Sequence, residues 1–201
     1  FDMVSPKGNI KDISLGVPVR INIENGVAAF AAAQLSGVTV DEIRSAMNSF
    51  EGVKRRFDFR IKSDKIVYID DYAHHPNELV AAISSIKSLF MDKKVTAIFQ
   101  PHLYSRTRDF ADDFAKSLSL LDDVILLDIY PAREAPIEGV TSQIIFDKIT
   151  SVEKKLCNKN DLIELLKNKH IEVLVTFGAG DIDQLVNKIE KLLRDKYMSK
   201  V

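Results

Sequence analysis

The chain has 201 residues, of which 46% are hydrophobic, and its 28 basic side chains nearly balance 29 acidic ones, so the formal net charge is −1 at neutral pH. This near balance argues against a protein that binds nucleic acid or an anionic membrane through a basic surface. The single cysteine, Cys157, cannot form an internal disulfide, and no stretch approaches the ~20 apolar residues of a membrane span, so we expect a cytoplasmic protein.

The first part of the chain predicts a small helical segment. Prolines and glycines interrupt residues 1–22, which indicates loops and one short strand. An alanine-rich run from Glu24 predicts a helix that ends at Gly37, a residue suited to a left-handed C-terminal cap. Thr39 then begins a second helix, because Glu42 three residues later completes a capping box. The apolar stripe of this second helix consists of Ile43, Ala46, Met47 and Phe50.

After Gly52 the pattern changes to short β-prone runs. Residues 56–61 and 65–69, joined by a polar turn, predict a hairpin. Beyond it, apolar runs alternate with helical ones, which predicts an α/β fold with a mostly parallel sheet covered on both faces. The predicted strands are 95–99, 124–129 and 173–177, and the predicted helices are 77–90, 106–121, 142–149, 161–169 and 181–196. In such sheets, ligands bind beyond the carboxyl ends of the strands.

The first cluster of polar residues follows the hairpin and reads Asp-Asp-Tyr-Ala-His-His-Pro-Asn-Glu over 70–78. Carboxylates can accept hydrogen bonds from ribose hydroxyls or hold Mg²⁺, and neutral imidazoles can orient a reacting group or bind a metal. The alternative is that the two aspartates solvate the strand end while Pro76 and Asn77 start the next helix. A zinc site is disfavoured, because adjacent histidines point in different directions and no cysteine lies nearby.

The second cluster follows the next predicted strand and includes His102, Arg106 and Arg108. Guanidinium groups match carboxylate and phosphate oxygens bidentately, so these side chains favour an anion-binding role. The alternative is that Ser105 or Thr107 caps the following helix and leaves both arginines as surface charges.

The third cluster, residues 128–139, contains Glu134 together with two prolines and a glycine, which predicts a long, shaped loop.

The fourth cluster is Gly178-Ala-Gly180-Asp181, which stands between a predicted strand and a predicted helix. It resembles a dinucleotide-binding fingerprint up to the sixth position, where Asp183 replaces the required small residue. The alternative is a tight turn in which Asp181 caps the helix.

Arg55-Arg56-Phe57-Asp58 lies where the helical segment meets the predicted sheet. An arginine at this junction can swing between domains toward a phosphate, whereas the alternative is a solvated basic run. We expect the interdomain hinge at residues 50–60, because a few residues at the ends of elements can absorb large dihedral changes.

Four ordered motifs together resemble the C-terminal part of the UDP-N-acetylmuramate:L-alanine ligases, a branch of the Mur ligases of peptidoglycan synthesis. The motifs are Arg-Arg-Phe-Asp at 55–58, Asp-Asp-Tyr-Ala-His-His-Pro at 70–76, Gln-Pro-His-Leu-Tyr-Ser-Arg-Thr-Arg-Asp at 100–109, and Tyr-Pro-Ala-Arg-Glu-Ala-Pro-Ile at 130–137. The resemblance implies a Rossmann-like C-terminal domain at 57–201, preceded at 1–56 by the helical tail of a truncated central ATP-binding domain.

The resemblance also implies an activity that serves the cell wall, and with it cell shape and division. The muramoyl carboxylate would be phosphorylated by ATP with Mg²⁺, and the amine of L-alanine would then displace phosphate from the acyl phosphate. The substrates would be UDP-N-acetylmuramate and L-alanine. The chain begins with Phe1 and contains no Gly-x-x-x-x-Gly-Lys-Ser/Thr phosphate loop, so we expect a fragment that is inactive alone.

Residue roles follow from the positions that match the motifs. The resemblance implies that nucleotide contacts come from Asn22, Asn25, Arg56 and Asp71. It implies catalytic roles for His74, His102, Arg106 and Arg108 around L-alanine and the reacting carboxyl group, and substrate binding by Tyr72, His75 and Glu134. No residue of the chain is assigned to a metal.

Two positions depart from the pattern of the family. Ile21 stands where relatives usually carry a histidine, and Leu103 stands where many carry an arginine. A related ligase recycles muramoyl peptides by attaching a tripeptide, and it is the first alternative. A metal-dependent hydrolase using Asp70, Asp71, His74, His75 and Asp128 is the second, and a non-catalytic anion-binding module is the third.

Overall fold

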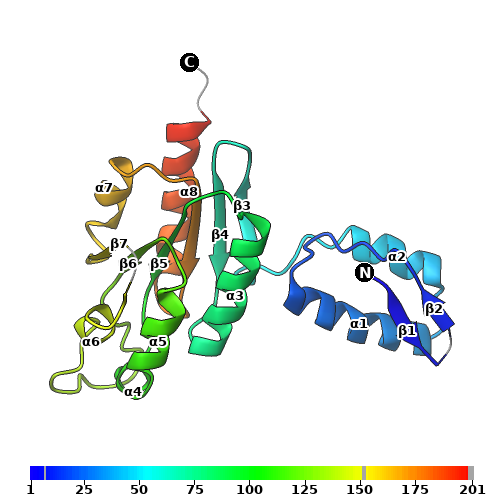
Figure 1. Cartoon of the computed structure of the whole chain (residues 1–201), viewed down its shortest axis with the longest axis horizontal. Helices are drawn as coiled ribbons and strands as arrows, with labels where there is room; N and C mark the ends of the chain where they lie inside the picture. Colours follow the sequence, from blue (N-terminus) through cyan, green and yellow to red (C-terminus); the bar gives the residue numbers. More distant parts are fainter. Residues whose placement is uncertain (7, 151–152, 199–201) are drawn as a thin grey trace. The chain divides into compact units, whose positions relative to one another are not determined.

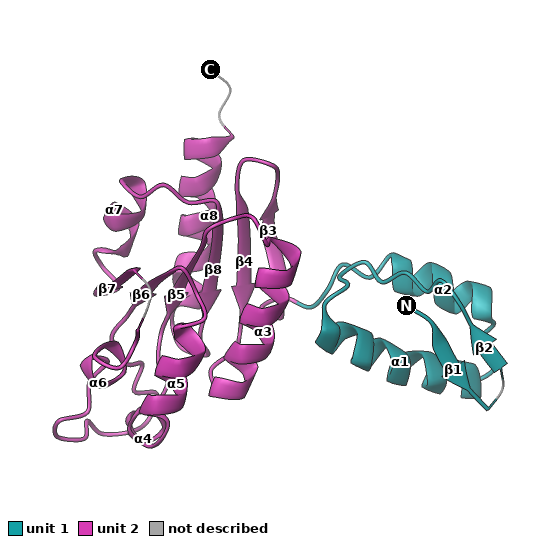
Figure 2. Cartoon of the chain, in the orientation of Figure 1, with its two compact units in different colours: residues 1–53 teal, residues 54–201 magenta. Residues whose placement is uncertain are grey.

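The computed structural model describes residues 1–6, 8–150 and 153–198. The chain divides into two compact units, Phe1–Val53 and Lys54–Val201 (Figure 2). This division falls three residues before the boundary that the sequence predicts. The assignment of the first unit to a central ATP-binding domain stays a prediction, and each unit is described by itself.

The first unit consists of a short hairpin and two helices. Strands β1 (Met3–Ser5) and β2 (Gly8–Ile10) pair antiparallel, so this segment holds two strands where the sequence predicts one. Helix α1 (Arg20–Leu35) begins four residues before the predicted start, and Gly37 follows it with a φ of +88° as expected for a left-handed cap. Helix α2 is Val40–Asn48.

The predicted capping box of α2 is confirmed, since Thr39 and Glu42 exchange hydrogen bonds. Ile43 and Met47 are buried and pack with Phe30 of α1, which forms the core shared by the two helices. Ala46 was expected in the same stripe but is exposed, because it lies on the flank of the helix that turns away from α1.

The second unit is built on a six-stranded sheet of order β3-β4-β8-β5-β6-β7. The strands are β3 (Asp58–Lys62), β4 (Val67–Asp71), β5 (Val95–Phe99), β6 (Asp123–Leu126), β7 (Glu153–Leu156) and β8 (Val173–Phe177). The β3–β4 pair is the predicted antiparallel hairpin, and all other neighbours are parallel. The predicted fold class, an α/β domain with a mostly parallel sheet, is confirmed.

The helices of this unit are α3 (Pro76–Leu89), α4 (Tyr104–Asp109), α5 (Ala111–Leu118), α6 (Gln143–Phe146), α7 (Leu162–Lys167) and α8 (Asp183–Tyr197). Three predictions need correction. The helix expected over 106–121 is two helices, because the chain leaves helical geometry at Phe110. The helix expected over 142–149 is the single turn of α6, and the edge strand β7 has no counterpart among the predicted strands.

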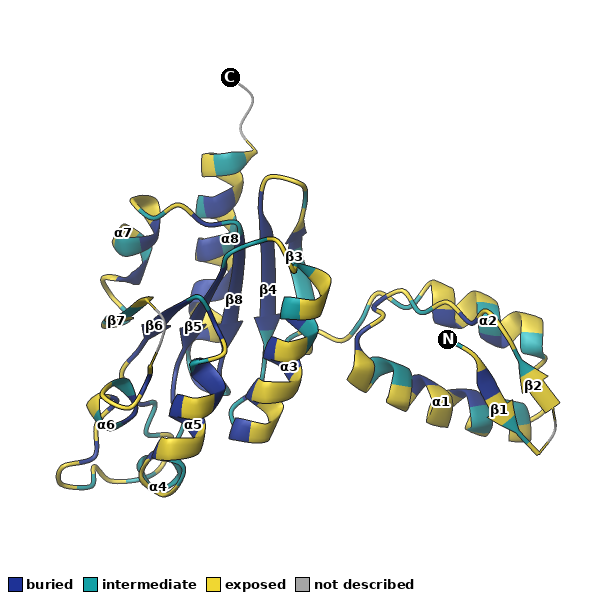
Figure 3. Cartoon of the chain, viewed as in Figure 1, coloured by how far each residue is buried: buried dark blue, intermediate teal, exposed yellow. Residues whose placement is uncertain are grey.

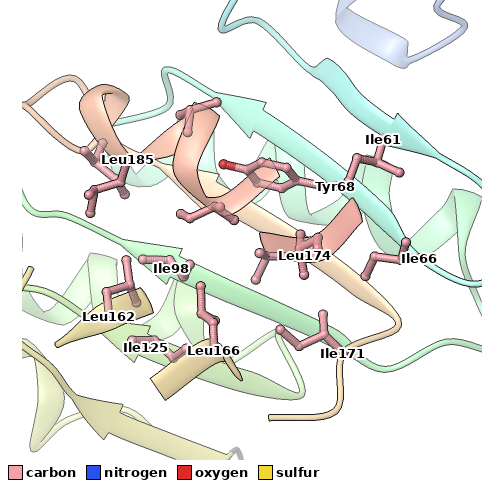
Figure 4. Packing of buried hydrophobic residues seen from close by; sticks show 14 of the residues in the cluster. Ile61, Ile66, Tyr68, Ile98, Ile125, Leu162, Leu166, Ile171, Leu174 and Leu185 are labelled. Carbon is pink, nitrogen blue, oxygen red and sulfur yellow. The ribbon is translucent and has the colours of Figure 1, made fainter. Parts of the chain in front are cut away.

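Helices cover both faces of the sheet (Figure 1). On one face, α5 packs between α3 and α6, and Phe99 of β5 meets Phe114 of α5, with ring centroids 5.3 Å apart. Residues of opposite parity along the strands, among them Tyr68, Ile98 and Leu174, pack against α7 and α8 on the other face (Figure 4).

The central strands are buried along their whole length (Figure 3). This double burial explains why β5 and β8 read as uninterrupted apolar runs. None of the described helices combines the length and apolar character needed to cross a membrane.

Candidate active site

The loops that follow β4, β5, β6 and β8 leave the same edge of the sheet, because these four parallel strands are neighbours. A chain of ring contacts runs along this edge. The Tyr72 and His74 rings lie 5.2 Å apart, those of His74 and His102 lie 6.0 Å apart, and those of His102 and Tyr130 lie 5.7 Å apart. The structure therefore brings together Tyr72, His74 and His102 from two of the predicted clusters.

Two polar atoms in this region are buried without a partner. Within the described part of the chain, neither Nδ1 of His102 nor Nη1 of Arg106 has a hydrogen-bond partner. Leaving a buried polar group unpaired costs about 1 to 3 kcal/mol, so both atoms are places where a ligand would regain the lost interaction. The region around His102 and Arg106 is therefore suited to an anionic or polar ligand.

The electrostatic surroundings of His102 favour its neutral form. Burial lowers its pKa, and the positive charge of Arg106 and the neighbouring His74 lower it further, although Glu134 opposes the shift. A neutral imidazole at pH 7 has a lone pair that can accept a proton. His102 is thus suited to general-base chemistry.

A cavity of about 310 Å³ adjoins His102 and is also lined by Leu103, Tyr130, Ala132 and Arg133. Leu103 and Ala132 both have positive φ values, +71° and +51°, a conformation that side-chain-bearing residues adopt at a cost. Such strain clusters at ligand sites, where the surrounding structure holds it in place. Arg133 makes no hydrogen bond or ion pair with any described residue, so its charge is available to this cavity.

Glu134 holds the start of α4. Its two carboxylate oxygens accept hydrogen bonds from the Ser105 backbone N–H at 2.9 Å and the Ser105 hydroxyl at 2.5 Å. These hydrogen bonds lower the pKa of Glu134, so it is ionised at neutral pH. Both alternative caps for this helix are wrong, because Ser105 donates to Glu134 and Thr107 donates to the Leu103 carbonyl. The geometry gives Glu134 a structural task, and direct substrate binding by it stays a prediction.

Arg106 and Arg108 differ in their surroundings although only one residue separates them. Two positions along a helix turn the side chain by about 200°, so the two guanidinium groups lie on different faces of α4. Arg108 is exposed and pairs with Asp109 at 2.8 Å. The structure thus places Arg106 beside His102 and leaves Arg108 on the surface, where its predicted catalytic role has no structural support.

The two adjacent histidines also diverge. Nδ1 of His74 lies 3.0 Å from the Tyr72 carbonyl, within the chain of rings. The ring of His75 packs instead against Phe110, with centroids 4.9 Å apart. Glu78 accepts hydrogen bonds from the backbone N–H groups of both histidines and so caps α3. A substrate-binding role for His75 stays a prediction.

Asp70 and Asp71 point to opposite faces of the sheet, because they are neighbours in one strand. Asp71 accepts hydrogen bonds from the N–H groups of Phe57 at 2.7 Å and Ala73 at 2.8 Å. Burial nevertheless raises its pKa to about 6. The residue is half-buried, and its predicted ribose contact stays a prediction.

Two consecutive arginines frame Tyr72, with guanidinium carbons 5.0 Å (Arg55) and 5.6 Å (Arg56) from its ring centroid. Arg55 is bound within the unit, since it donates to the Gly178 carbonyl at 2.6 Å and pairs with Asp70 at 3.3 Å. Arg56 is exposed and forms no ion pair with a described residue. Of the two, Arg56 is the one without an ion pair, and its predicted contact with the nucleotide stays a prediction.

Asn22 and Asn25 lie on α1 of the first unit. The Asn22 side-chain amide donates to the Val17 carbonyl at 3.2 Å, whereas Asn25 is exposed. Their proposed contact with an adenine ring stays a prediction.

The residues of the hydrolase alternative do not assemble. Among the described residues, no three His, Cys, Asp or Glu side chains are placed to share a metal ion. Asp70 is engaged by Arg55 and Thr176, while Asp128 lines a separate cavity of about 330 Å³ beside Cys157. The structure therefore offers this alternative no support.

The chain bends at Gly178–Asp181 between β8 and α8, and Asp181 does not cap α8 as the alternative predicts. One Asp181 oxygen accepts a hydrogen bond from the Gln100 amide at 2.8 Å, and the other pairs with Lys159. The N-cap residue of α8 is Ile182, so no side chain caps this helix.

Three residues of this edge were not among the predicted site residues: Gln100, Tyr130 and Arg133. All three stand inside the quoted motifs at 100–109 and 130–137. Their position after predicted strands was a usable signal, because the carboxyl ends of neighbouring strands converge.

Comparisons with known proteins agree with the fold and the motifs. Residues 55–182 match the family model described as "Mur ligase, glutamate ligase domain". The chain is 61% identical to the UDP-N-acetylmuramate–L-alanine ligase of Phocaeicola vulgatus. The match covers 98% of this chain and 43% of the Phocaeicola vulgatus protein. The chain thus spans about two-fifths of the length of this curated relative.

Solved structures give the same picture. The UDP-N-acetylmuramate–alanine ligase of Thermotoga maritima is similar with a TM-score of 0.76 and 27% identity, covering 90% of this chain and 40% of that one. A murein peptide ligase of Psychrobacter arcticus has a TM-score of 0.61 and 22% identity over 90% of this chain and 38% of that one. The second likeness concerns the fold alone.

Proposed function

The chain belongs to the Mur ligase family, and from this premise we propose that the whole protein is an ATP-dependent, ADP-forming ligase that joins L-alanine to UDP-N-acetylmuramate in the cytoplasm. The similarity to the Phocaeicola vulgatus ligase supports this choice of substrates. The observation that carries the proposal is the pair of buried, unpartnered atoms on His102 and Arg106, which would serve as polar partners of the incoming amino acid.

In this proposal the second unit receives L-alanine. The free Nη1 of Arg106 binds a carboxylate oxygen, as guanidinium groups do in charge-assisted pairs. Neutral His102 accepts a proton from the alanine ammonium group, which frees the nitrogen lone pair. The amine then attacks the carbonyl carbon of the acyl phosphate and forms a tetrahedral intermediate. As this collapses, the carbon–oxygen bond to phosphate breaks, and the departing phosphate takes up the second proton lost by the nitrogen. The ring of His74 contacts that of His102, and the ring of Tyr72 contacts that of His74, so both side chains line one side of the site at His102.

ATP would supply the phosphoryl group that activates the muramoyl carboxylate. The residues of this chain proposed to contact such a ligand are Arg56, which forms no ion pair with a described residue, and the half-buried Asp71. Asn22 and Asn25 would add contacts from the first unit. Mg²⁺ is expected to accompany ATP, although among the described residues no three His, Cys, Asp or Glu side chains are placed to hold it together.

The test uses the full-length protein with UDP-N-acetylmuramate, ATP and Mg²⁺, and phosphate release is measured with and without L-alanine. The proposal predicts release that depends on L-alanine. Release that is indifferent to L-alanine would overturn it. The 201-residue chain contains no phosphate-loop motif and is expected to be silent in the same assay.

A further inference from the structure

The Gly178–Asp181 turn resembles a phosphate-binding fingerprint, but protein groups already fill the space beside its glycines. A Cβ atom on Gly180 would lie 2.6 Å from Oε1 of Gln100 and 2.7 Å from Cβ and Cγ of Tyr130. A Cβ on Gly178 would lie 2.9 Å from the Gln100 carbonyl oxygen. The glycines therefore permit close packing of Tyr130 and Gln100, and they leave no free cradle for a pyrophosphate at this turn.

Hydrogen bonds fix the turn to the end of β5. The buried Gln100 amide donates to Asp181 at 2.8 Å, and its oxygen accepts the N–H of Ile182 at 2.9 Å. Lys159 pairs with the second oxygen of Asp181, and Arg55 donates to the Gly178 carbonyl at 2.6 Å. The turn is thus held from several sides, so it can act as a rigid support.

The residue that rests on this support is Tyr130. Its backbone is fixed to the second cluster, because its N–H donates to the Pro101 carbonyl at 2.8 Å and its carbonyl accepts the N–H of Leu103 at 2.9 Å. Its ring faces His102 at a centroid distance of 5.7 Å and an interplanar angle of 35°. Both rings line the cavity of about 310 Å³. Any displacement of the Tyr130 ring would therefore change both the cavity and the surroundings of His102.

We infer that Gly180 and Asp181 are positioning residues, which hold the Tyr130 ring against His102 and thereby shape the amino-acid cavity of the ligase. This inference rests on the proposed function for the identity of the ligand, but the geometry that it describes does not depend on activity.

The first test compares Tyr130→Phe, Tyr130→Ala and Gly180→Ala in the full-length protein. No described residue hydrogen-bonds to the Tyr130 hydroxyl, so Tyr130→Phe keeps the ring and its packing and should raise the KM for L-alanine less than Tyr130→Ala does. Tyr130→Ala and Gly180→Ala should each raise that KM by about ten-fold or more, because a misplacement of ~1 Å in a binding site can cost up to ~100-fold. The KM for ATP should stay within about two-fold in all three variants.

A double variant checks that both changes act through the same contact. If Gly180→Ala acts by displacing the Tyr130 ring, adding it to Tyr130→Ala should raise the KM by less than the product of the two single effects. Full multiplication of the effects would contradict the inference. If Gly180→Ala does not fold, Asp181→Ala, which removes the two side-chain contacts of the turn, replaces it with the same expected rise in the KM for L-alanine.

A second readout is independent of turnover. The imidazole resonances of His102, identified by their loss in His102→Gln, are followed by NMR in the full-length protein labelled at histidine. Tyr130→Ala and Gly180→Ala should shift them and raise the pKa of His102 toward its ordinary value, because the ring no longer excludes water, whereas Tyr130→Phe should leave the pKa in place.

The two readouts separate the two proposals. Unchanged His102 resonances in Gly180→Ala would overturn the positioning role. Shifted resonances in a protein without alanine-dependent phosphate release would support the positioning role and reject the proposed function.

Discussion

A buried chain of three polar side chains links the sheet to the junction at Arg55, and it gives a sharp prediction for stability. The Thr176 hydroxyl donates to Asp70 at 2.7 Å, and the Tyr68 hydroxyl lies 3.2 Å from the same Thr176 oxygen. All three residues are at most 1% exposed. Because the Thr176 proton goes to the carboxylate, the Tyr68 hydroxyl donates to Thr176.

Thr176→Val keeps the shape of the side chain and removes both interactions. Losing a hydrogen bond to a charged group costs about 1.5 to 3 kcal/mol, and leaving the Tyr68 hydroxyl buried without a partner costs about 1 to 3 kcal/mol. We therefore expect the free energy of unfolding of the second unit to fall by about 2.5 to 6 kcal/mol. Adding Tyr68→Phe removes the orphaned hydroxyl, so the double variant should be more stable than Thr176→Val by about 1 kcal/mol or more.

Urea unfolding followed by tyrosine fluorescence measures this unit selectively. The chain has no tryptophan, and all five tyrosines lie after residue 54. Tyr68→Phe alone completes the double-mutant cycle. A cost below about 1 kcal/mol for Thr176→Val, or a double variant no more stable than the single one, would refute the buried network as described.

Three further predictions concern charge. In the full-length protein, Arg106→Lys should raise the KM for L-alanine by about 10- to 100-fold, because the variant loses a guanidinium contact. Arg108 is exposed, so Arg108→Lys should leave this KM within about two-fold. Equal effects of the two variants in steady-state kinetics would contradict the separation of the two side chains. His102 must be neutral to accept a proton, and its pKa is lowered. As the pH decreases, kcat/KM should therefore fall only below the ordinary histidine pKa of ~6.5. A fall in kcat/KM that already begins above pH ~6.5 would exclude His102 as the base. Burial raises the pKa of Asp71 from 3.8 to about 6, so its ionisation destabilises the fold as pH rises through this range. Asp71→Asn lacks this cost, so its stability relative to the original chain should increase between pH 4 and pH 7, by at most about 3 kcal/mol, and a pH-independent difference in urea unfolding would show that the pKa is not raised.

The sequence was most informative where burial dictates the residue types. The bounds of β5 and β8 were predicted to the residue, because strands buried on both faces consist of continuous apolar runs. The edge strand β7 (Glu-Lys-Lys-Leu) escaped notice, since its side chains are half exposed and its charges do not resemble a strand. The break at Phe110 was missed for another reason: the apolar period continues through it, while the backbone turns there without a proline or glycine as a signal.

The candidate site shows the same division. Residue types and strand ends sufficed to predict that Tyr72, His74, His102 and Arg106 lie at one edge of the sheet. Their individual tasks depend on side-chain direction, which spacing alone does not fix. Glu134 binds the start of α4, and the turn at Gly178 packs against protein groups where its pattern suggested a phosphate. These distinctions arise from contacts between residues far apart in the sequence.

The most direct test of the central claim is a competition between amine substrates. Full-length protein is given UDP-N-acetylmuramate, ATP and Mg²⁺ with equal amounts of L-alanine and the free tripeptide that the recycling ligases attach, and the products are identified by mass spectrometry. We expect a product heavier by one alanyl residue, and this product should disappear in Arg106→Met. A product carrying the tripeptide would move the protein to the recycling ligases, and the absence of any amide product would contradict the proposed ligase activity.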